Sequence, residues 1–179
     1  MNNLVVVSDF KGRFFLPQSG STVIALSYTN QITEFQSEFL RELLGYSFYK
    51  ELDEAVTNSE LEENPTSLDD KWTKLINGDD VVINEVTKRY CGLKELLIQF
   101  CYVSIMESNF KSISGSGIST SVSENGETVD PTFFILSNFN KLVRQIWVED
   151  YPIYDYLFLN SSIYPIYEKS KLLKIKNFI

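Results

Sequence analysis

Histidine is absent from the chain, and there are only two cysteines among its 179 residues. Without histidine the protein lacks the side chain that most often acts as a general base or a metal ligand near neutral pH. Cys91 and Cys101 would lie about 15 Å apart along one helix, which is too far for a disulfide bond. We therefore expect reduced thiols, no metal site, no cofactor and no enzymatic activity.

Other signatures of catalysis are also missing. The sequence has no zinc-ligand spacing, and its Ser-rich glycine segment contains no GKS or GKT phosphate-binding motif. Two pairs of adjacent acids, Asp69/Asp70 and Asp79/Asp80, are present. Acids near helix ends usually cap the helix or interact with its dipole. A hydrolase built on either pair is the weakest of three interpretations, and it requires a deep pocket around Asp69 or Asp79.

Basic residues are scarce. The chain has 16 Lys and Arg against 24 Asp and Glu, a net charge of −8, which argues against a surface that grips nucleic acid. An acidic wall would instead let a polyanion slide past without sticking. Long hydrophobic runs are absent, so we expect no segment that spans a bilayer. The start, MNNLVVVSDF, has no basic flank or small-residue cleavage site, so we expect no signal peptide.

The strongest positive signal is the stretch GLKELLIQFCYVSIMESNF, where apolar residues recur at intervals of three and four around more than one face. This pattern predicts a central helix over about residues 92–111, covered from several sides. Helices at about Ile32–Leu44 and Phe133–Val148 are predicted to cover it. The first of them extends back toward Thr22 through a β-branched stretch with weak helix propensity. The fold class is mainly α, a helical bundle in one domain over residues 1–179.

Smaller elements lie between these helices. Gly45 is placed to end the first helix, a second short helix is predicted over Tyr46–Val56, and residues 57–66 read as an acidic loop. Ser67 and Asp70 resemble a capping box that starts another short helix.

That helix runs through Trp72–Ile76 and ends at Asn77-Gly78. The β-prone segments Val81–Ile83 and Thr87–Tyr90 then predict a small hairpin joined by residues 84–86. Asp130-Pro131 opens the last long helix, and Tyr154–Leu159 predicts a further helical turn or two.

Three segments are predicted to be extended. The N-terminal arm, residues 1–20, must lie on something, either its own body or a neighbouring subunit, because exposing its phenylalanines to water is unfavourable. Residues 112–129 are rich in Ser, Gly and Thr, and form either a surface loop or a segment that becomes ordered on a partner. Residues 171–179 alternate apolar and basic side chains, which predicts a C-terminal strand able to dock on another chain.

Aromatic residues are plentiful, with ten Tyr, thirteen Phe and two Trp. Surfaces rich in tyrosine are typical of protein interfaces, although the same rings could instead cover the core. The candidate residues of a partner interface are Phe10, Phe14, Phe15, Ile118, Val122, Tyr164, Tyr167, Leu173, Ile175 and Phe178.

Five segments, in order, resemble a known series. They are SDFKGRFFLPQS, then FQSEFLRELLGYSFYKEL, the W-x-x-L-I-x-G of Trp72–Gly78, the central helix with a small-residue loop ending in SEN, and the YP-x-Y of Tyr164–Tyr167. In this order they resemble the head–tail connector proteins, also called neck or adaptor proteins, of tailed bacteriophages of Bacteroides-type hosts. The resemblance covers roughly residues 8–168 and rests on order and spacing, not on one diagnostic motif.

This resemblance implies a virion protein without catalytic activity, assembled in the host cytoplasm. Copies of the subunit would form a ring, dodecameric to match the portal, that continues the DNA channel and docks tail or further neck proteins. Genome DNA would pass through without sequence-specific binding. The alternative from another class is a monomeric helical module that binds one protein partner and has no role in a virion.

Overall fold

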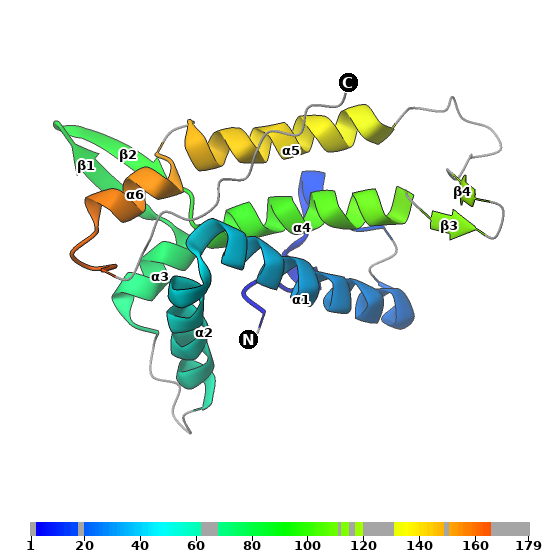
Figure 1. Ribbon diagram of the computed structural model, residues 1–179, viewed down its shortest axis with the longest axis horizontal. Helices are drawn as coiled ribbons and strands as arrows, with labels where there is room; N and C mark the ends of the chain where they lie inside the picture. Colours follow the sequence, from blue (N-terminus) through cyan, green and yellow to red (C-terminus); the bar gives the residue numbers. More distant parts are fainter. Residues whose placement is uncertain are drawn as a thin grey trace.

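The computed structural model describes residues 3–17, 20–61, 68–110, 112–114, 117–119, 131–148 and 151–165. It is mainly helical with a small antiparallel hairpin, as the sequence predicts (Figure 1). In chain order the elements are the 3-10 turns η1 (Val7–Asp9) and η2 (Gly12–Phe14), then α1 (Thr22–Leu44), α2 (Tyr46–Leu61), α3 (Asp70–Asn77), β1 (Asp79–Ile83), β2 (Val86–Tyr90), α4 (Leu93–Phe110), β3 (Ser112–Ser114), β4 (Gly117–Ser119), α5 (Pro131–Trp147) and α6 (Ile153–Leu159).

Helix α4 lies at the centre of the bundle. It packs between α1 and α5, and it also contacts α3 and η2 (Figure 1). Leu93, Leu96, Leu97, Cys101 and Ile105 are fully buried along it. The prediction of a central helix over about residues 92–111 is confirmed. Neighbouring elements cover α4 on several sides, and this allows apolar residues on more than one of its faces to be buried.

The long helices α1 and α5 flank α4. Helix α1 begins at Thr22 despite its β-branched start. Gly45 caps its C-terminus, donating its backbone N–H to a carbonyl of the helix, and its φ of +78° favours glycine. Ile32, Phe39 and Leu43 are buried on the side facing the core. In α5 the predicted stripe is buried at Leu142 and Ile146. These packed faces explain why the later part of each helix could be predicted well.

The boundaries of α2 and α3 differ from the predictions. Helix α2 continues to Leu61, so residues 57–61 of the predicted acidic loop are helical. Within this extension the Ser59 hydroxyl donates back to the carbonyl of Val56 at 2.8 Å, so its polar group is satisfied by the helix itself. At α3 the predicted capping box is wrong, since Asp69 is the N-cap residue and its side chain accepts from the Lys71 N–H.

The hairpin is longer than predicted. Asn84 and Glu85 both have positive φ, +49° and +65°, so two residues make the tight turn and Val86 pairs with Ile83 as part of β2. At the other end Asp79 pairs with Tyr90. Helix α6 lies beside this hairpin (Figure 1), where the Tyr156 ring stacks on the Tyr90 ring with centroids 4.2 Å apart.

The N-terminal arm packs on its own chain. Val5, Phe10 and Leu16 are buried in the core, and the Val5 N–H donates to the buried Oε1 of Gln36 at 3.3 Å. The sequence left open whether the arm packs on its own chain or on a neighbouring subunit. These residues pack on their own chain. Its backbone forms two 3-10 turns within the predicted extended segment.

Two predicted segments fall largely outside the described residues. Within residues 112–129, strands β3 and β4 form a short antiparallel hairpin, and residues 120–129 are not described. The predicted C-terminal strand, residues 171–179, also lies outside the described residues. The sequence IYPIY, around Pro165, also predicts an extended segment over Ile163–Tyr167. Residues 160–163 instead form a turn, in which the Ile163 N–H donates to the Asn160 carbonyl at 2.9 Å, so the prediction is wrong at Ile163.

None of the helices in the described part of the chain is both long enough and apolar enough to cross a bilayer.

Gly78 and Gly92 bring two stretches of main chain into contact. Gly78 follows α3 with φ of +96°, and Gly92 precedes α4 with φ of +90°. A Cβ atom added at Gly92 would lie 2.5 Å from the Gly78 nitrogen, and one at Gly78 would lie 2.5 Å from the Tyr90 carbonyl oxygen. Only glycine can therefore occupy either position without a shift of backbone.

Substitution of Gly92 by alanine should lower the free energy of unfolding by about 3 kcal/mol or more, because it combines a strained φ with a backbone collision. Gly12→Ala, with φ of +58° and open space around its Cβ, should lose only about 1 kcal/mol. Gly20→Ala, in open space without positive φ, should change stability by less than about 0.5 kcal/mol. Urea unfolding of the three variants measures the series, and equal losses at Gly92 and Gly12 would contradict the importance of the close approach.

Candidate functional site

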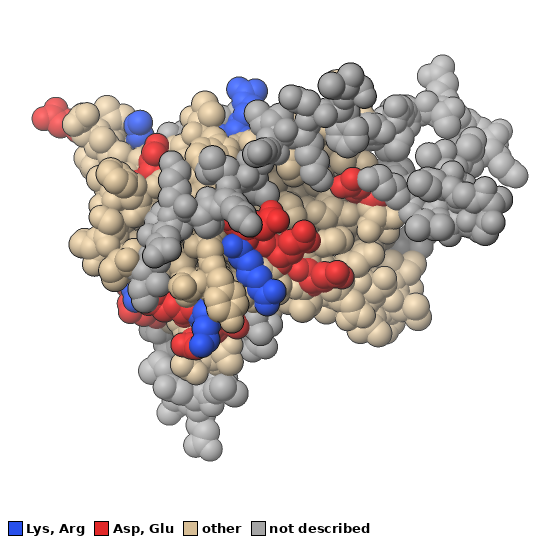
Figure 2. All heavy atoms as spheres, viewed as in Figure 1, with Lys and Arg blue, Asp and Glu red and all other residues tan. Residues whose placement is uncertain are grey.

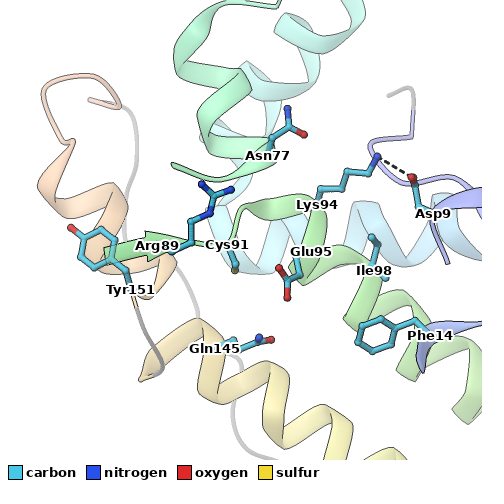
Figure 3. A pocket seen from close by; sticks show the side chains of 10 residues that line it. All are labelled: Asp9, Phe14, Asn77, Arg89, Cys91, Lys94, Glu95, Ile98, Gln145 and Tyr151. Atoms are coloured by element: carbon cyan, nitrogen blue, oxygen red, sulfur yellow. Dashed lines mark ion pairs between the residues drawn. The ribbon is translucent and has the colours of Figure 1, made fainter. Parts of the chain in front are cut away.

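A cleft of about 560 Å³ lies where the arm, α3, β2, α4 and α5 meet (Figure 3). Its side chains come from segments far apart in the sequence, which is the usual arrangement of a functional pocket. The residues that line it are Asp9, Phe14, Asn77, Arg89, Cys91, Lys94, Glu95, Ile98, Gln145 and Tyr151.

The two cations in the cleft each have a carboxylate partner. Lys94 Nζ lies 3.0 Å from Asp9 Oδ1, and Arg89 Nη1 lies 3.0 Å from Asp80 Oδ1. A phosphate or carboxylate ligand would have to compete with these carboxylates, so the cleft is poorly suited to an anion. The Cys91 thiol donates to the carbonyl oxygen of Gly92 at 3.8 Å. A carbonyl oxygen cannot generate the thiolate that nucleophilic catalysis needs.

Across the part of the chain that the structure describes, no group of three or more Cys, Asp or Glu side chains is arranged to hold a metal ion.

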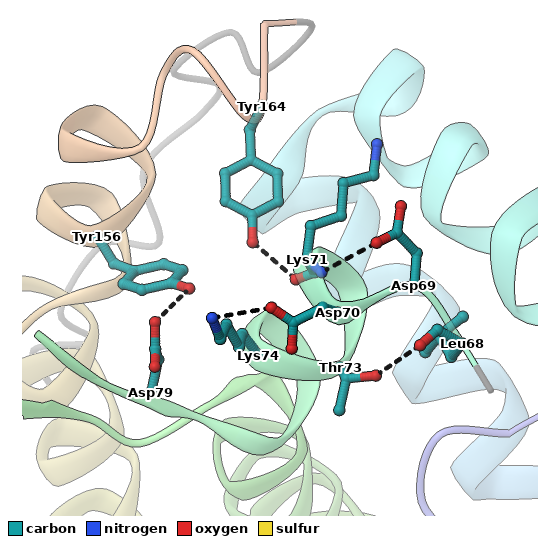
Figure 4. A network of polar contacts seen from close by, with 9 residues as sticks. All are labelled: Leu68, Asp69, Asp70, Lys71, Thr73, Lys74, Asp79, Tyr156 and Tyr164. Atoms are coloured by element: carbon teal, nitrogen blue, oxygen red, sulfur yellow. Dashed lines mark hydrogen bonds and ion pairs between the residues drawn. The ribbon is translucent and has the colours of Figure 1, made fainter.

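The adjacent acid pairs hold structural elements together (Figure 4). Asp69 caps α3, and Asp70 Oδ2 lies 2.9 Å from Lys74 Nζ one turn along the same helix. This contact raises the pKa of Lys74, the hydrogen bond to Asp70 being the main cause. Asp79 Oδ2 accepts a hydrogen bond from the Tyr156 hydroxyl at 3.3 Å. The hydrolase interpretation requires a deep pocket lined by Asp69 or Asp79. Neither residue lines the cleft in Figure 3.

Buried tyrosines join α6 and the turn after it to the rest of the core. The Tyr164 hydroxyl donates to the Lys71 carbonyl at 2.7 Å, and the Tyr90 hydroxyl donates to the Leu75 carbonyl at 3.0 Å. The Tyr154 hydroxyl donates to the Leu43 carbonyl at 3.4 Å. Burial raises the pKa of Tyr90 and Tyr156, because the charged phenolate is poorly solvated there. These tyrosines therefore serve the fold as neutral hydrogen-bond donors.

Exposed apolar side chains gather at the two ends of the long axis. The first helical turns of α1 and α5 lie at one end, and the hairpin and α6 lie at the other (Figure 1). We call these the α1/α5 end and the hairpin/α6 end. Phe133 is 78% exposed in α5, and Phe158 is 81% exposed in α6. Of the exposed large apolar residues in the described part of the chain, Val23, Leu26, Phe133 and Phe134 belong to the first end and Val82, Val86, Phe158, Leu159 and Ile163 to the second. Four others lie elsewhere: Val6 and Phe15 in the arm, Tyr46 at the start of α2 and Val148 just after α5.

The candidate interface residues separate into three groups. Phe10 and Tyr164 are buried in the chain's own core, so the prediction that they face a partner is wrong for this conformation. Phe14 is half-buried, with its ring 5.4 Å from that of Tyr102, whereas Phe15 is 59% exposed. Ile118 belongs to β4, paired with Ile113. The remaining candidates, Val122, Tyr167, Leu173, Ile175 and Phe178, lie outside the described residues.

Sequence reasoning missed the exposure of several large apolar residues. Phe133 begins a run of apolar residues spaced by three along α5, but such a run drifts around a helix of 3.6 residues per turn. Phe133 therefore lies on the opposite side of α5 from the buried Leu142 and is 78% exposed.

Val82 and Val86 flank the hairpin turn, and Val82 is 68% exposed. A two-stranded hairpin buries one face at most, and Val82, paired with Thr87, lies on the outward face. Val86 pairs with Ile83 on the other face and is exposed next to the turn, at the tip of the hairpin.

Comparison of the chain with models of protein families, with curated proteins and with solved structures gave no match.

The buried tyrosines predict a loss of stability at alkaline pH. Burial raises the pKa of Tyr154 from 10.0 to about 12, so the folded state holds this proton more tightly than the unfolded state does. Its stabilising contribution is complete below pH 10 and is lost as the pH rises toward 12, by up to about 1.4 kcal/mol per pH unit.

The variant Tyr154→Phe isolates this contribution. At pH 8 it should be about 1 kcal/mol less stable than the natural chain, because the hydrogen bond to Leu43 is lost. Urea unfolding from pH 8 to 11 should show the two stabilities converging above pH 10. A difference that stays constant across this range would contradict the assignment.

Proposed function

We propose that this chain is a structural subunit that assembles with copies of itself into a ring, and that the ring belongs to the neck of a tailed phage, between portal and tail. The observation that carries the proposal is the pair of exposed apolar surfaces at opposite ends of the molecule. The resemblance of the sequence to head–tail connector proteins supports the more specific part.

A ring needs heterologous contacts, in which one surface of a subunit meets a different surface of the next. The two ends meet this requirement, since the α1/α5 end exposes Phe133 and the hairpin/α6 end exposes Phe158. The two surfaces are also built from different elements, so neither is a copy of the other. Contiguous exposed apolar patches mark interaction sites in proteins, and each end has two exposed apolar residues next to each other in the chain, Phe133 with Phe134 and Phe158 with Leu159.

The remaining features agree with a structural role. The two cations of the cleft in Figure 3 are paired, and the acid pairs cap and join elements of the fold. The net charge of −8 suits the wall of a channel that DNA passes through without being bound. We propose that portal and tail proteins contact the ring, and that it functions in the virion after assembly in the host cytoplasm.

Mixing two variants tests the head-to-tail arrangement. Phe133→Asp disables the α1/α5 end, and Phe158→Asp disables the hairpin/α6 end. Each substitution places a charge against an apolar partner and should weaken self-association by about 2 kcal/mol, roughly thirtyfold. Light scattering should show each variant alone as a monomer, and the equimolar mixture as a dimer with one intact contact.

The control is Ser47→Asp, which adds the same charge at an exposed polar position of α2 and should assemble like the natural chain. A mixture that remains monomeric would refute the head-to-tail contact between these two ends. If the natural chain stays monomeric and also does not bind the portal protein, the result would instead support the alternative, a helical module that binds a single partner.

A further inference from the structure

A second hollow, of about 350 Å³, lies between α1, α4 and α5. Its floor is apolar. Phe35 comes from α1, Phe100 and Val103 from α4, and Phe139 from α5. Val103 and Phe139 are buried, while Phe35 and Phe100 are half-buried. We call this hollow the α1/α4 groove.

The rim of the α1/α4 groove is acidic. Glu38 and Glu107 line it directly, and Glu34 and Glu42 lie one helical turn to either side of Glu38, so all three glutamates share one face of α1. Figure 2 shows acidic side chains gathered across the middle of this face of the molecule, over α1 and α4. The nearby cation of α1, Arg41, lies over the Tyr49 ring, 5.3 Å from its centroid. The groove therefore suits a segment that is apolar on one side and basic on the other.

The end of this chain has that pattern. Residues 169–179, KSKLLKIKNFI, contain four lysines and no acidic side chain, although the chain as a whole has a net charge of −8. Leu173 and Ile175 alternate with Lys174 and Lys176, so an extended backbone places the apolar pair on one side and the basic pair on the other. Both the apolar floor and the acidic rim are matched by one short segment.

The segment is also long enough to reach the groove. The described residues end at Pro165. Leu173 and Ile175 lie eight and ten residues further on, so an extended backbone lets them reach at most about 29 and 36 Å from Pro165. Helix α4, with 18 residues, is about 27 Å long. A segment tethered to the same chain has an effective concentration in the millimolar range, so it outcompetes the same segment of a neighbour wherever the geometry permits.

We propose that residues 169–179 dock in the α1/α4 groove of their own chain, with Leu173 and Ile175 on its floor and Lys174 and Lys176 against its glutamates. This assignment differs from the sequence-based expectation that Leu173 and Ile175 contact a partner. It does not depend on the proposed ring, because the groove and the tail belong to one molecule.

Disulfide trapping in the full-length chain tests the proposal. In a Cys91→Ser background, Ser104→Cys or Ser108→Cys on the groove is combined with Leu173→Cys or Ile175→Cys in the tail. Cys101 is buried and can be retained. The control pair replaces the groove position by Thr87→Cys, exposed on β2. At least one groove pair should form an intramolecular disulfide roughly tenfold faster than the control pair.

Charge reversal identifies the cause of docking. Lys174→Glu with Lys176→Glu should reduce trapping to the level of the control, and adding Glu38→Lys with Glu107→Lys should restore it. Lys50→Glu, exposed on α2, should have no effect. The proposal is overturned if no groove pair exceeds the control, if the disulfides join two chains, or if the reversed charges on the groove fail to rescue the reversed tail.

Discussion

The close approach of Gly78 and Gly92 fixes the arrangement of the other elements. The hairpin leaves the core after Gly78 and returns before Gly92, so contact between these two glycines joins the end of α3 to the start of α4. Helix α4 then enters the bundle in one direction, and α1 and α5 pack on either side of it. Tyr90, at the base of the hairpin, receives the ring of Tyr156 and thereby sets the place of α6. A side chain at either glycine would separate the two stretches of backbone from which this arrangement follows.

The core is completed within one chain, and this shapes what the surface can do. The arm contributes Phe10 and the turn after α6 contributes Tyr164, so both termini of the described structure help to close the core. The aromatic and aliphatic residues that remain exposed are then a surplus that folding does not use. Most of them belong to elements at the two ends of the long axis, which gives the molecule two different apolar surfaces. Intramolecular tyrosine hydrogen bonds stabilise the fold, whereas Phe133 and Phe158 are available for association.

The sequence predicted the elements that local physics determines. The period of α4, the glycine that ends α1 and the β-prone segments of the hairpin were all recognisable, because each depends on neighbours within a few residues. The N-cap of α3 was placed two residues early, since Ser67 and Asp69 both have capping side chains. Burial of Phe10 could not be predicted, because it depends on which distant elements cover that position. Exposure of Phe133 was predictable from helix geometry, because this residue lies on the opposite side of α5 from Leu142. The contact between Gly78 and Gly92 could not be predicted either, because nothing in the sequence indicates that these two loop glycines lie close together in space.

Association through the two ends is the central claim, and the mass of the particles that the full-length chain forms tests it most directly. Native mass spectrometry over a rising concentration series, with and without the portal protein, measures this mass. The account predicts a closed assembly with a single, fixed number of copies, because repeated head-to-tail contacts that close into a ring leave no free end. A chain that stays monomeric at every concentration in both conditions would contradict it, as would dimers that never grow.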